Sequence, residues 1–230
     1  MDGLRKSTGL LNCLPTELAA KLFGRSVHGR AKADTVLFSA GEQGDGLYIV
    51  ETGLLKVVME SPDGEARIIS LLGPGEIAGE FAMIDGLPRS ASVVVLQECS
   101  YRFVSQANFE KFAAEHPEFY RELAMVLSTR LRQADHALLA ATFLSGKARL
   151  ARALLELAGH VGQPSGSGGV MFTCKISNGE LAAMAGMARE NVSRVLGEWR
   201  DRKLVSQSGQ LHCIHDTAAL EREMASNADR

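Results

Sequence analysis

The chain has 230 residues, 46% of them hydrophobic, so it is long for one domain, comfortable for two, and not a disordered polymer. Its net charge of −2 at pH 7 excludes a uniformly basic nucleic-acid coat. Residues 1–144 carry 14 Lys and Arg against 18 Asp and Glu, whereas residues 145–230 carry 11 against 9. If DNA is bound, we therefore expect the C-terminal part to bind it.

The four cysteines, at positions 13, 99, 174 and 213, form no Cys-x-x-Cys pair and no metal-ligand spacing. We therefore expect neither zinc nor disulfides, and the single N-terminal Cys13 argues against an iron–sulfur cluster. No apolar run reaches transmembrane length, and the first residues contain no secretory segment. We expect a soluble cytoplasmic protein without a membrane partner.

Residues 1–30 look helical, with Pro15 in the first turn of "PTELAAKLFG" and Gly24 at its end. From about Val36, short β-branched or aromatic runs alternate with turns such as "GEQGDG", "SPDGE" and "GPGE" every 8–14 residues. Two more strands follow at "SASVVVL" and "CSYRFVS". This rhythm predicts a small β-barrel or roll.

A long helical region follows, because no glycine occurs from Gln106 to Ser145 and Pro117 interrupts it only early. From about Glu118 we expect one helix of some 24 residues, whose apolar positions step by 4, 3, 4 and 3: Leu127, Leu131, Ala134, Leu138 and Ala141. This narrow seam favours a parallel coiled-coil dimer. The alternative is an amphipathic helix that packs on its own barrel.

A new unit begins near residue 144, where Ser145 is a plausible N-cap of a helix with apolar residues at helical spacing. The stretch "GQPSGSGG", residues 162–169, is interpreted as a flexible surface loop. It is not a phosphate cradle, because no Lys-Ser/Thr follows it to open a helix.

Residues 176–205 have the pattern of a helix-turn-helix. Ser177 and Glu180 form a capping-box pattern, and Gly186 marks a tight turn before a second helix. In that helix an apolar stripe is formed by Val192, Val195, Leu196 and Trp199. Off the stripe, at the N-terminal end, lie Arg189, Glu190, Ser193 and Arg194. Arg suits guanine and Glu suits cytosine, so this set predicts DNA reading. "KLVSQSGQLHCI" then predicts a hairpin wing, and a three-helix bundle with a solvated charged face is the alternative.

Residues 79–91, "GEFAMIDGLPRSA", carry a carboxylate and a guanidinium at the two ends of a tight loop. Either Glu80 and Arg89 neutralise each other, or they hold something between them. One cation and one acceptor match a cyclic nucleotide, which offers one anionic phosphodiester and one free ribose hydroxyl.

The sequence resembles the cyclic AMP receptor protein (CRP/FNR) family of bacterial transcription regulators over residues 18–215. The shared features, in chain order, are the barrel, the Gly-Glu…Arg-Ser loop, the long helix with the apolar seam, and the winged helix-turn-helix. The loop at 79–91 and the "ARENVSR" helix carry the resemblance. It implies an α+β fold with a cyclic-nucleotide-binding β-roll at residues 1–105. A dimerisation helix and hinge at 106–144 and a winged helix-turn-helix at 145–230 would follow.

For the loop, the resemblance implies that Gly79 and Glu80 meet the ribose, with Glu80 accepting from its 2′-hydroxyl. Arg89 would pair with the cyclic phosphate, and Ser90 would add hydrogen bonds. The remaining positions of the predicted nucleotide site in this loop are Phe81, Ala82 and Ala91.

Two positions that read the base in the family fall at Ala134 and Asp135, where small hydroxyl residues are usual. An acceptor-only carboxylate suits the adenine amino group and suits the two guanine donors better. A helix Asp in this role and a hydroxyl directly after the loop arginine, here that of Ser90, also resemble cGMP-reading domains of channels and kinases. The resemblance therefore implies a cAMP receptor that also accepts cGMP. Arg130 is expected to reach the pocket or Glu80, or else to pair at the surface; Asp135 facing solvent beside Arg132 or Arg130 is the alternative.

For DNA, the resemblance implies a homodimer whose Arg189, Glu190 and Arg194 read a TGTGA-type half-site of a palindrome. Ala188 stands where an N-cap hydroxyl is usual, and Asn191, in place of the family's frequent Thr, can still donate to a phosphate. A hinge at 143–145 would transmit nucleotide binding. RNA polymerase is an expected partner, with residues 160–169 as its candidate contact.

Other classes of function fit less well. No nucleophile–base pair, metal cluster or paired carboxylates indicate an enzyme. A regulatory subunit without DNA binding would not need the three charged residues on the second helix. A family member that ignores nucleotides would have a degraded loop, whereas this one is intact.

Overall fold

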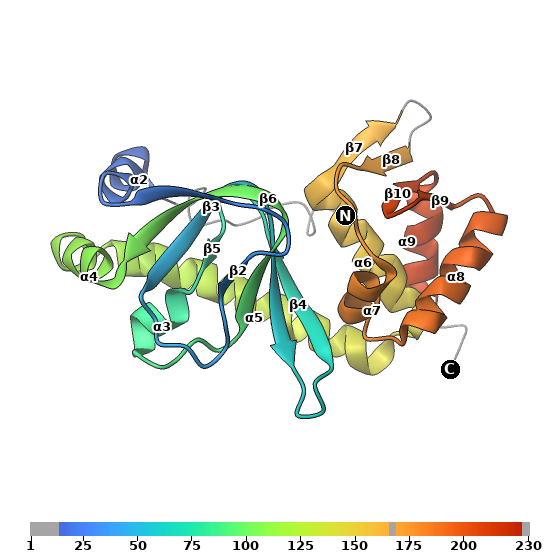
Figure 1. Ribbon diagram of the computed structural model, residues 1–230, viewed down its shortest axis with the longest axis horizontal. Helices are drawn as coiled ribbons and strands as arrows, with labels where there is room; N and C mark the ends of the chain where they lie inside the picture. Colours follow the sequence, from blue (N-terminus) through green and yellow to red (C-terminus); the bar gives the residue numbers. More distant parts are fainter. Residues whose placement is uncertain (1–13, 166–168, 227–230) are drawn as a thin grey trace. The chain divides into compact units, whose positions relative to one another are not determined.

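The computed structural model describes residues 14–165 and 169–226, drawn in Figure 1. The chain forms two compact units, which meet in the sequence between Gln133 and Ala134. Each unit is described by itself, and the expectations for residues 1–13 lie outside the described residues. The domain boundaries at 105 and 144 stay predictions.

The N-terminal unit is the expected antiparallel β-roll. Its six-stranded sheet has the order β1-β6-β3-β4, while β2 also pairs with β6 and β5 with β3. The strands are β1 (Val27–Ala31), β2 (Val36–Phe38), β3 (Gly46–Glu60), β4 (Ala66–Leu72), β5 (Ile77–Ala78) and β6 (Ser92–Ser105). Alternate side chains enter a core that includes Leu47, Ile49 and Val104.

Two local expectations for this unit are wrong. Residues 27–30 are not helical, because β1 is an edge strand that pairs with β6 from Val27↔Phe103 to Ala31↔Cys99. The two strands expected at "SASVVVL" and "CSYRFVS" are one 14-residue strand, β6. Gln97 and Glu98 lie within it, and irregular pairing with β3 absorbs the change of register there.

Within the described residues 14–143 four helices accompany this sheet: α2 (Thr16–Phe23), α3 (Glu80–Asp85), α4 (Gln106–Glu115) and α5 (Phe119–Phe143), whose last residues, from Ala134, belong to the second unit. Gly24 is the C-cap of α2 as expected, whereas Pro15 is its N-cap and precedes the first turn in which it was expected. Buried Phe109, Phe112 and Phe119 pack edge to face where α4 meets α5. Within residues 14–165 and 169–226 no helix is long and apolar enough to cross a bilayer.

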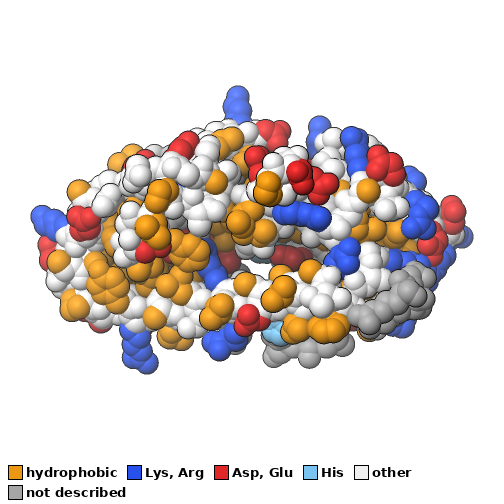
Figure 2. Space-filling view, turned by 90° about the horizontal axis from the view of Figure 1, so that it is seen from below, with side chains coloured by type: hydrophobic (Ala, Val, Ile, Leu, Met, Phe, Trp, Pro, Cys, Tyr) orange, Lys and Arg blue, Asp and Glu red, His pale blue; other side chains and the backbone are white. Residues whose placement is uncertain are grey.

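The 25-residue helix α5 begins near the expected position and leaves part of its apolar seam exposed. Leu131 and Leu138 are 65% and 68% exposed. Nearby on the helix, Leu139 and Phe143 are also more than half exposed. On the face drawn in Figure 2, hydrophobic side chains lie at the surface among charged ones. Exposed leucines at this spacing are typical of a face that another helix covers.

The C-terminal unit contains α6 (Gly146–Val161), β7 (Gly162–Ser165), β8 (Gly169–Phe172), α7 (Asn178–Ala185), α8 (Arg189–Asp201), β9 (Val205–Ser208), β10 (Leu211–Ile214) and α9 (Thr217–Ala225). Its sheet has the order β7-β8-β10-β9. The prediction of a surface loop at residues 162–169 is wrong at both ends of that segment, because Gly162–Ser165 pairs with Gly169–Phe172 as a hairpin. The Gly- and Ser-rich composition of this segment gives no strand signal, because its β-structure depends on pairing with the neighbouring strand.

The capping box at the start of α7 is confirmed. The Ser177 Oγ accepts the backbone N–H of Glu180 at 3.1 Å, and the Glu180 carboxylate accepts the backbone N–H of Ser177 at 2.8 Å. Two of the N–H groups that a helix start leaves without partners are thereby satisfied.

Ser177→Ala is expected to lower the free energy of unfolding of this unit by about 1 kcal/mol, because the cap acceptor is lost. Trp199 is the only tryptophan and is fully buried in α8, so its fluorescence reports unfolding of this unit. Ser208→Ala, at an exposed strand position, is the matched control and is expected to leave the denaturation midpoint unchanged. Equal midpoints for both variants would contradict the role of the cap.

Candidate functional site

The segment from Gly79 to Ala91, here called the cassette, contains the short helix α3. Gly79 has φ +88° and Gly86 has φ +68°, so left-handed residues flank the helix at both ends. A Cβ at Gly79 would lie 2.2 Å from the Arg89 Nη1 atom. Any other residue would therefore clash with the guanidinium as well as adopt a strained backbone. The glycine lets the two ends of the cassette approach each other.

Arg89, near the C-terminal end of the cassette, is buried, with only 4% of its surface exposed. Its Nη1 donates to the Gly79 carbonyl at 2.8 Å, and its Nη2 donates to the Gly46 carbonyl and to Asp45 Oδ1, both at 2.7 Å. The guanidinium lies 4.2 Å from the centre of the Phe38 ring. Its Nε is buried without a hydrogen-bond partner among the described residues. An unused buried donor is the feature expected where an anionic ligand binds.

Glu80 is the second buried charge of the cassette and is 1% exposed. Its carboxylate forms an ion pair with Arg130 Nη1, while Arg130 Nη2 donates to the Ile77 carbonyl. Glu80 and Arg89 thus each have a different partner, which disfavours the alternative that they neutralise each other. Of the two roles considered for Arg130, the one in which it reaches Glu80 is present, and it ties α5 to the cassette.

The other predicted nucleotide-site residues differ in exposure. Ala82 and Ala91 are buried, whereas Phe81 is 43% exposed and Ser90 is exposed. Ala134 and Asp135 are exposed positions of α5 in the second compact unit. Their contact with a base stays a prediction.

The C-terminal unit brings the predicted DNA-reading residues to one end of α8. Gly186, in the left-handed region with φ +64°, makes the turn between α7 and α8. The buried stripe is the predicted one, Val192, Val195, Leu196 and Trp199. The predicted DNA-reading residues are all exposed: Arg189, Glu190, Asn191, Ser193 and Arg194.

Hydrogen bonds orient part of this surface. The Ser193 hydroxyl donates to the Arg189 carbonyl at 3.1 Å and accepts from the Asn178 side-chain amide at 3.0 Å. Ala188 caps α8 without a side-chain hydrogen bond, as its missing hydroxyl predicts. The first N–H groups of α8 are therefore available to an external acceptor such as a phosphate.

Three residues that position the two sites were missed in the sequence. Asp45 and Phe38 hold the cassette arginine from separate segments. Arg149 on α6 donates to the Leu144, Ala185 and Gly186 carbonyls at 2.9, 2.7 and 3.2 Å, and so joins the segment after α5 to the helix-turn-helix turn. A local pattern does not reveal them, since each partner is distant in sequence or is a backbone carbonyl.

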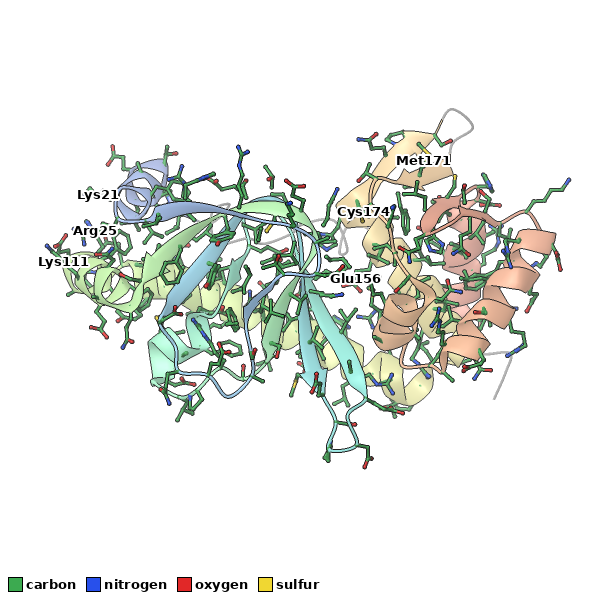
Figure 3. The ribbon with its side chains drawn as sticks, viewed as in Figure 1. Lys21, Arg25, Lys111, Glu156, Met171 and Cys174 are labelled. Atoms are coloured by element: carbon green, nitrogen blue, oxygen red, sulfur yellow. The ribbon has the colours of Figure 1, made fainter. Side chains whose placement is uncertain are left out.

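Within the described part of the chain, no group of three or more His, Cys, Asp or Glu is arranged so that it could hold a metal ion. Cys99, Cys174 and Cys213 are free thiols. Burial raises the pKa of Cys174 to about 11, so its thiol stays protonated at neutral pH. Figure 3 places Cys174 after β8 and the exposed Met171 on that strand.

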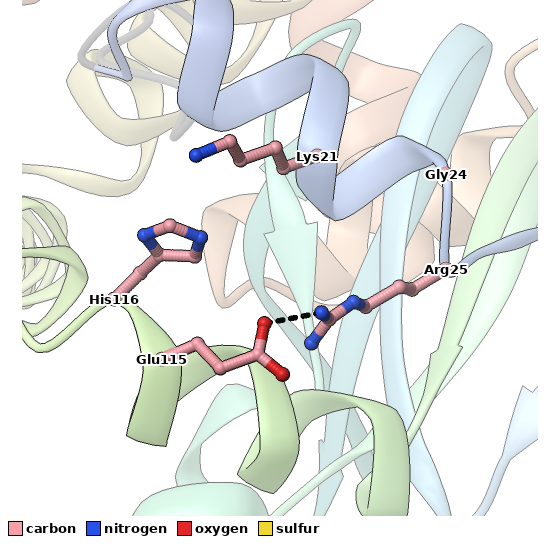
Figure 4. A pocket seen from close by; sticks show the side chains of 5 residues that line it. All are labelled: Lys21, Gly24, Arg25, Glu115 and His116. Carbon is pink, nitrogen blue, oxygen red and sulfur yellow. Dashed lines mark hydrogen bonds and ion pairs between the residues drawn. The ribbon is translucent and has the colours of Figure 1, made fainter.

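A separate surface hollow of about 580 Å³ lies between α2 and the end of α4 (Figure 4) and shares no residue with the cassette. Its lining residues are Lys21, Gly24, Arg25, Glu115 and His116. An ion pair between Arg25 and Glu115 crosses it. Lys21 lies on α2, Arg25 follows its C-cap Gly24, and Lys111 lies on α4 (Figure 3).

Comparison with known proteins agrees with this division into two sites. The cyclic nucleotide-binding domain model matches residues 29–116, and the Crp-like helix-turn-helix domain model matches residues 148–223. The first range contains the cassette, and the second contains α7, α8 and the β9–β10 wing.

Among curated proteins, the chain is 30% identical to a CRP-like cAMP-activated global transcriptional regulator of Mycobacterium tuberculosis, over 81% of this chain and 83% of the relative. It is 32% identical to the cyclic AMP receptor protein of Thermus thermophilus, over 89% and 90% of the two chains. The solved structure of a CRP/FNR-family transcriptional regulator from Thermus thermophilus has a TM-score of 0.75 at 26% identity, covering 88% of this chain and 100% of the other. The chain therefore belongs to the CRP/FNR family of DNA-binding transcription regulators, with an N-terminal cyclic nucleotide-binding domain and a C-terminal helix-turn-helix.

Proposed function

We propose that this protein is a cyclic-nucleotide-dependent transcription regulator whose homodimer binds cAMP and then a palindromic TGTGA-type site. One observation carries the proposal. A buried carboxylate, Glu80, and a buried guanidinium, Arg89, lie at the two ends of one glycine-hinged cassette and do not pair with each other. Their chemistry matches the ribose hydroxyl and the phosphodiester of a cyclic nucleotide.

In this proposal Arg89 holds the cyclic phosphate and its unused Nε–H supplies one of the donors. Glu80 accepts from the ribose 2′-hydroxyl, and Gly79 lets the sugar approach the backbone. Ser90 and the short lining residues Ala82 and Ala91 complete the pocket. The nucleotide acts as an allosteric ligand and undergoes no reaction.

Arg130 provides a route from the cassette to α5. A ribose hydroxyl on Glu80 competes with Arg130 for the same carboxylate, so nucleotide binding changes the contact between the cassette and the helix. A ligand shifts a conformational equilibrium only by its preference for one of the states. We infer that the nucleotide favours the DNA-binding state through this contact, with the segment at residues 143–145 as the hinge.

The exposed leucines of α5 support the homodimer. Leu131 and Leu138 are seven residues apart, which is the spacing of a coiled-coil interface. Two recognition helices in one dimer would enter successive major grooves, about one DNA turn apart. Arg189, Glu190 and Arg194 then read base edges, while Asn191 and Ser193 contact the backbone. RNA polymerase is a further proposed partner, on the resemblance alone.

The test is the affinity for a TGTGA palindrome, measured by fluorescence anisotropy without nucleotide, with cAMP and with cGMP. We expect at least a tenfold tighter affinity with cAMP, because the nucleotide-bound state is the competent one. A response to cGMP is expected as well, since two parallel donors of guanine suit the Asp135 carboxylate. Asp135→Ala should then weaken the cGMP response more than the cAMP response, and Glu122→Ala on the same helix is the control.

One observation favours a second candidate, a family member that binds DNA without nucleotide. Each cassette charge already has a partner of opposite sign, Asp45 for Arg89 and Arg130 for Glu80. A charge-balanced cassette is stable without a ligand. Equal DNA affinity in all three conditions would support this candidate and overturn the nucleotide-dependent one.

A further inference from the structure

The cassette arginine is paired with a carboxylate that comes from outside the cassette. Asp45 lies in the turn before β3, 44 positions before Arg89, and its Oδ1 accepts from Arg89 Nη2 at 2.7 Å. Backbone hydrogen bonds of 2.8 Å, from Gly41 N–H to the Arg89 carbonyl and from Arg89 N–H to the Glu42 carbonyl, fix this turn beside the arginine. The pair is therefore built into the fold.

The donors of Arg89 show what this carboxylate occupies. Both Nη2 hydrogens are engaged, by Asp45 and by the Gly46 carbonyl, and Nη1 donates to the Gly79 carbonyl. The Nε–H is free and buried. A bidentate phosphate contact on the Nε side of a guanidinium uses Nε together with Nη2. A phosphate in this position would therefore compete with Asp45 for Nη2 of Arg89.

The charges lead to the same conclusion. Glu80 with Arg130 and Arg89 with Asp45 make two balanced pairs, so the cassette offers a phosphodiester no net positive charge. The field of the carboxylate also reaches Tyr48 on β3, whose pKa is raised to about 12 by burial and then by the charge of Asp45. A cyclic phosphate on Arg89 must approach this carboxylate against like-charge repulsion.

We propose that Asp45 is an internal competitor of the nucleotide phosphate, which weakens binding of the ligand class assigned above and so sets the concentration range of the response. This inference rests on the proposed function. The Asp45 side chain is 67% exposed while the side chain of Arg89 is 1% exposed. The carboxylate can therefore turn into water when the phosphate arrives, whereas the Gly46 and Gly79 carbonyls keep the arginine in place.

The test is isothermal titration of the full-length protein with cAMP, comparing wild type with Asp45→Asn. The amide keeps an oxygen acceptor for Arg89 Nη2 and removes only the charge, so the fold is retained. We expect the Kd to fall roughly tenfold, since one like charge a few ångströms from the phosphate is removed. Glu42→Gln is the matched control, because it removes the same charge from the same exposed turn without a side-chain contact to Arg89. It should leave the Kd within about twofold of wild type.

The outcomes separate this inference from the proposed function. If wild type binds cAMP and Asp45→Asn binds no more tightly than Glu42→Gln, the competitor role is overturned while the proposed function stands. Weaker binding by Asp45→Asn would overturn it too, because Asp45 would then position the arginine for the phosphate. If neither wild type nor Asp45→Asn binds cAMP or cGMP, the proposed function fails and this inference falls with it. Binding by Asp45→Asn alone would support the competitor in its strongest form.

Discussion

Arg89→Ala is expected to raise the Kd for cAMP by about 100-fold and to remove the nucleotide dependence of DNA binding. The substitution deletes a charge-assisted contact to the phosphodiester, which contributes about 3 kcal/mol at a buried site. Isothermal titration measures the first effect, and anisotropy with a TGTGA palindrome measures the second. Of the changes considered for the cassette, this one is expected to have the largest effect on nucleotide binding.

The control for this variant must address folding, because the truncation also leaves the Gly46 and Gly79 carbonyls without their guanidinium donors. Arg89→Lys keeps the charge but not the planar fork, so an intermediate loss of affinity is expected. Thermal unfolding of both variants shows whether the N-terminal unit is retained. A folded Arg89→Ala protein with unchanged cAMP affinity would show that the arginine serves only the ion pair with Asp45.

Arg194→Ala is expected to weaken binding to the specific palindrome by about 10- to 100-fold, which is the loss of one bidentate base contact of about 1–3 kcal/mol. Binding to scrambled DNA of the same length should weaken far less, because it depends on phosphate contacts. The measurement is anisotropy with both DNAs in saturating cAMP. The ratio of the two affinities is the quantity that should fall.

Arg200→Ala is the matched control for Arg194, since it removes the same charge from an exposed position near the other end of α8. It is expected to change both affinities slightly and their ratio not at all. If Arg194→Ala and Arg200→Ala reduce the affinities equally for both DNAs, Arg194 contributes only charge. The base-reading role of the exposed end of α8 would then be wrong.

Features set by local sequence were predicted well. The Ser177–Glu180 capping box, the left-handed Gly186 and the buried stripe of α8 each involve residues at most a few positions apart. The length of α5 followed from the absence of glycine after Gln106. The cassette was located because its two charges and its glycines lie in one short segment. Such patterns report backbone conformation and helix faces directly.

Features set by distant partners were mostly not predictable in this way. The pair of Arg130 with Glu80, 50 positions earlier, was one of two roles considered and was suggested only by the family resemblance. The pair of Arg89 with Asp45, 44 positions earlier, was not foreseen. Read alone, Asp45 is one of several polar residues in a turn. The hairpin at 162–172 and the continuity of β6 were missed for the same reason, because a strand is defined by its neighbour across the sheet.

The pairing of β6 also determines when the N-terminal unit can form during synthesis. β1, β2 and β3 all pair with β6, whose last residue is Ser105, so most of this sheet closes only after that residue has left the ribosome. At about 5–20 residues per second, the earlier strands wait several seconds without their central partner. The unpaired edges and β-branched runs of these strands are then open to holdase chaperones. A codon-dependent pause before β6 has left the ribosome would lengthen this exposed interval.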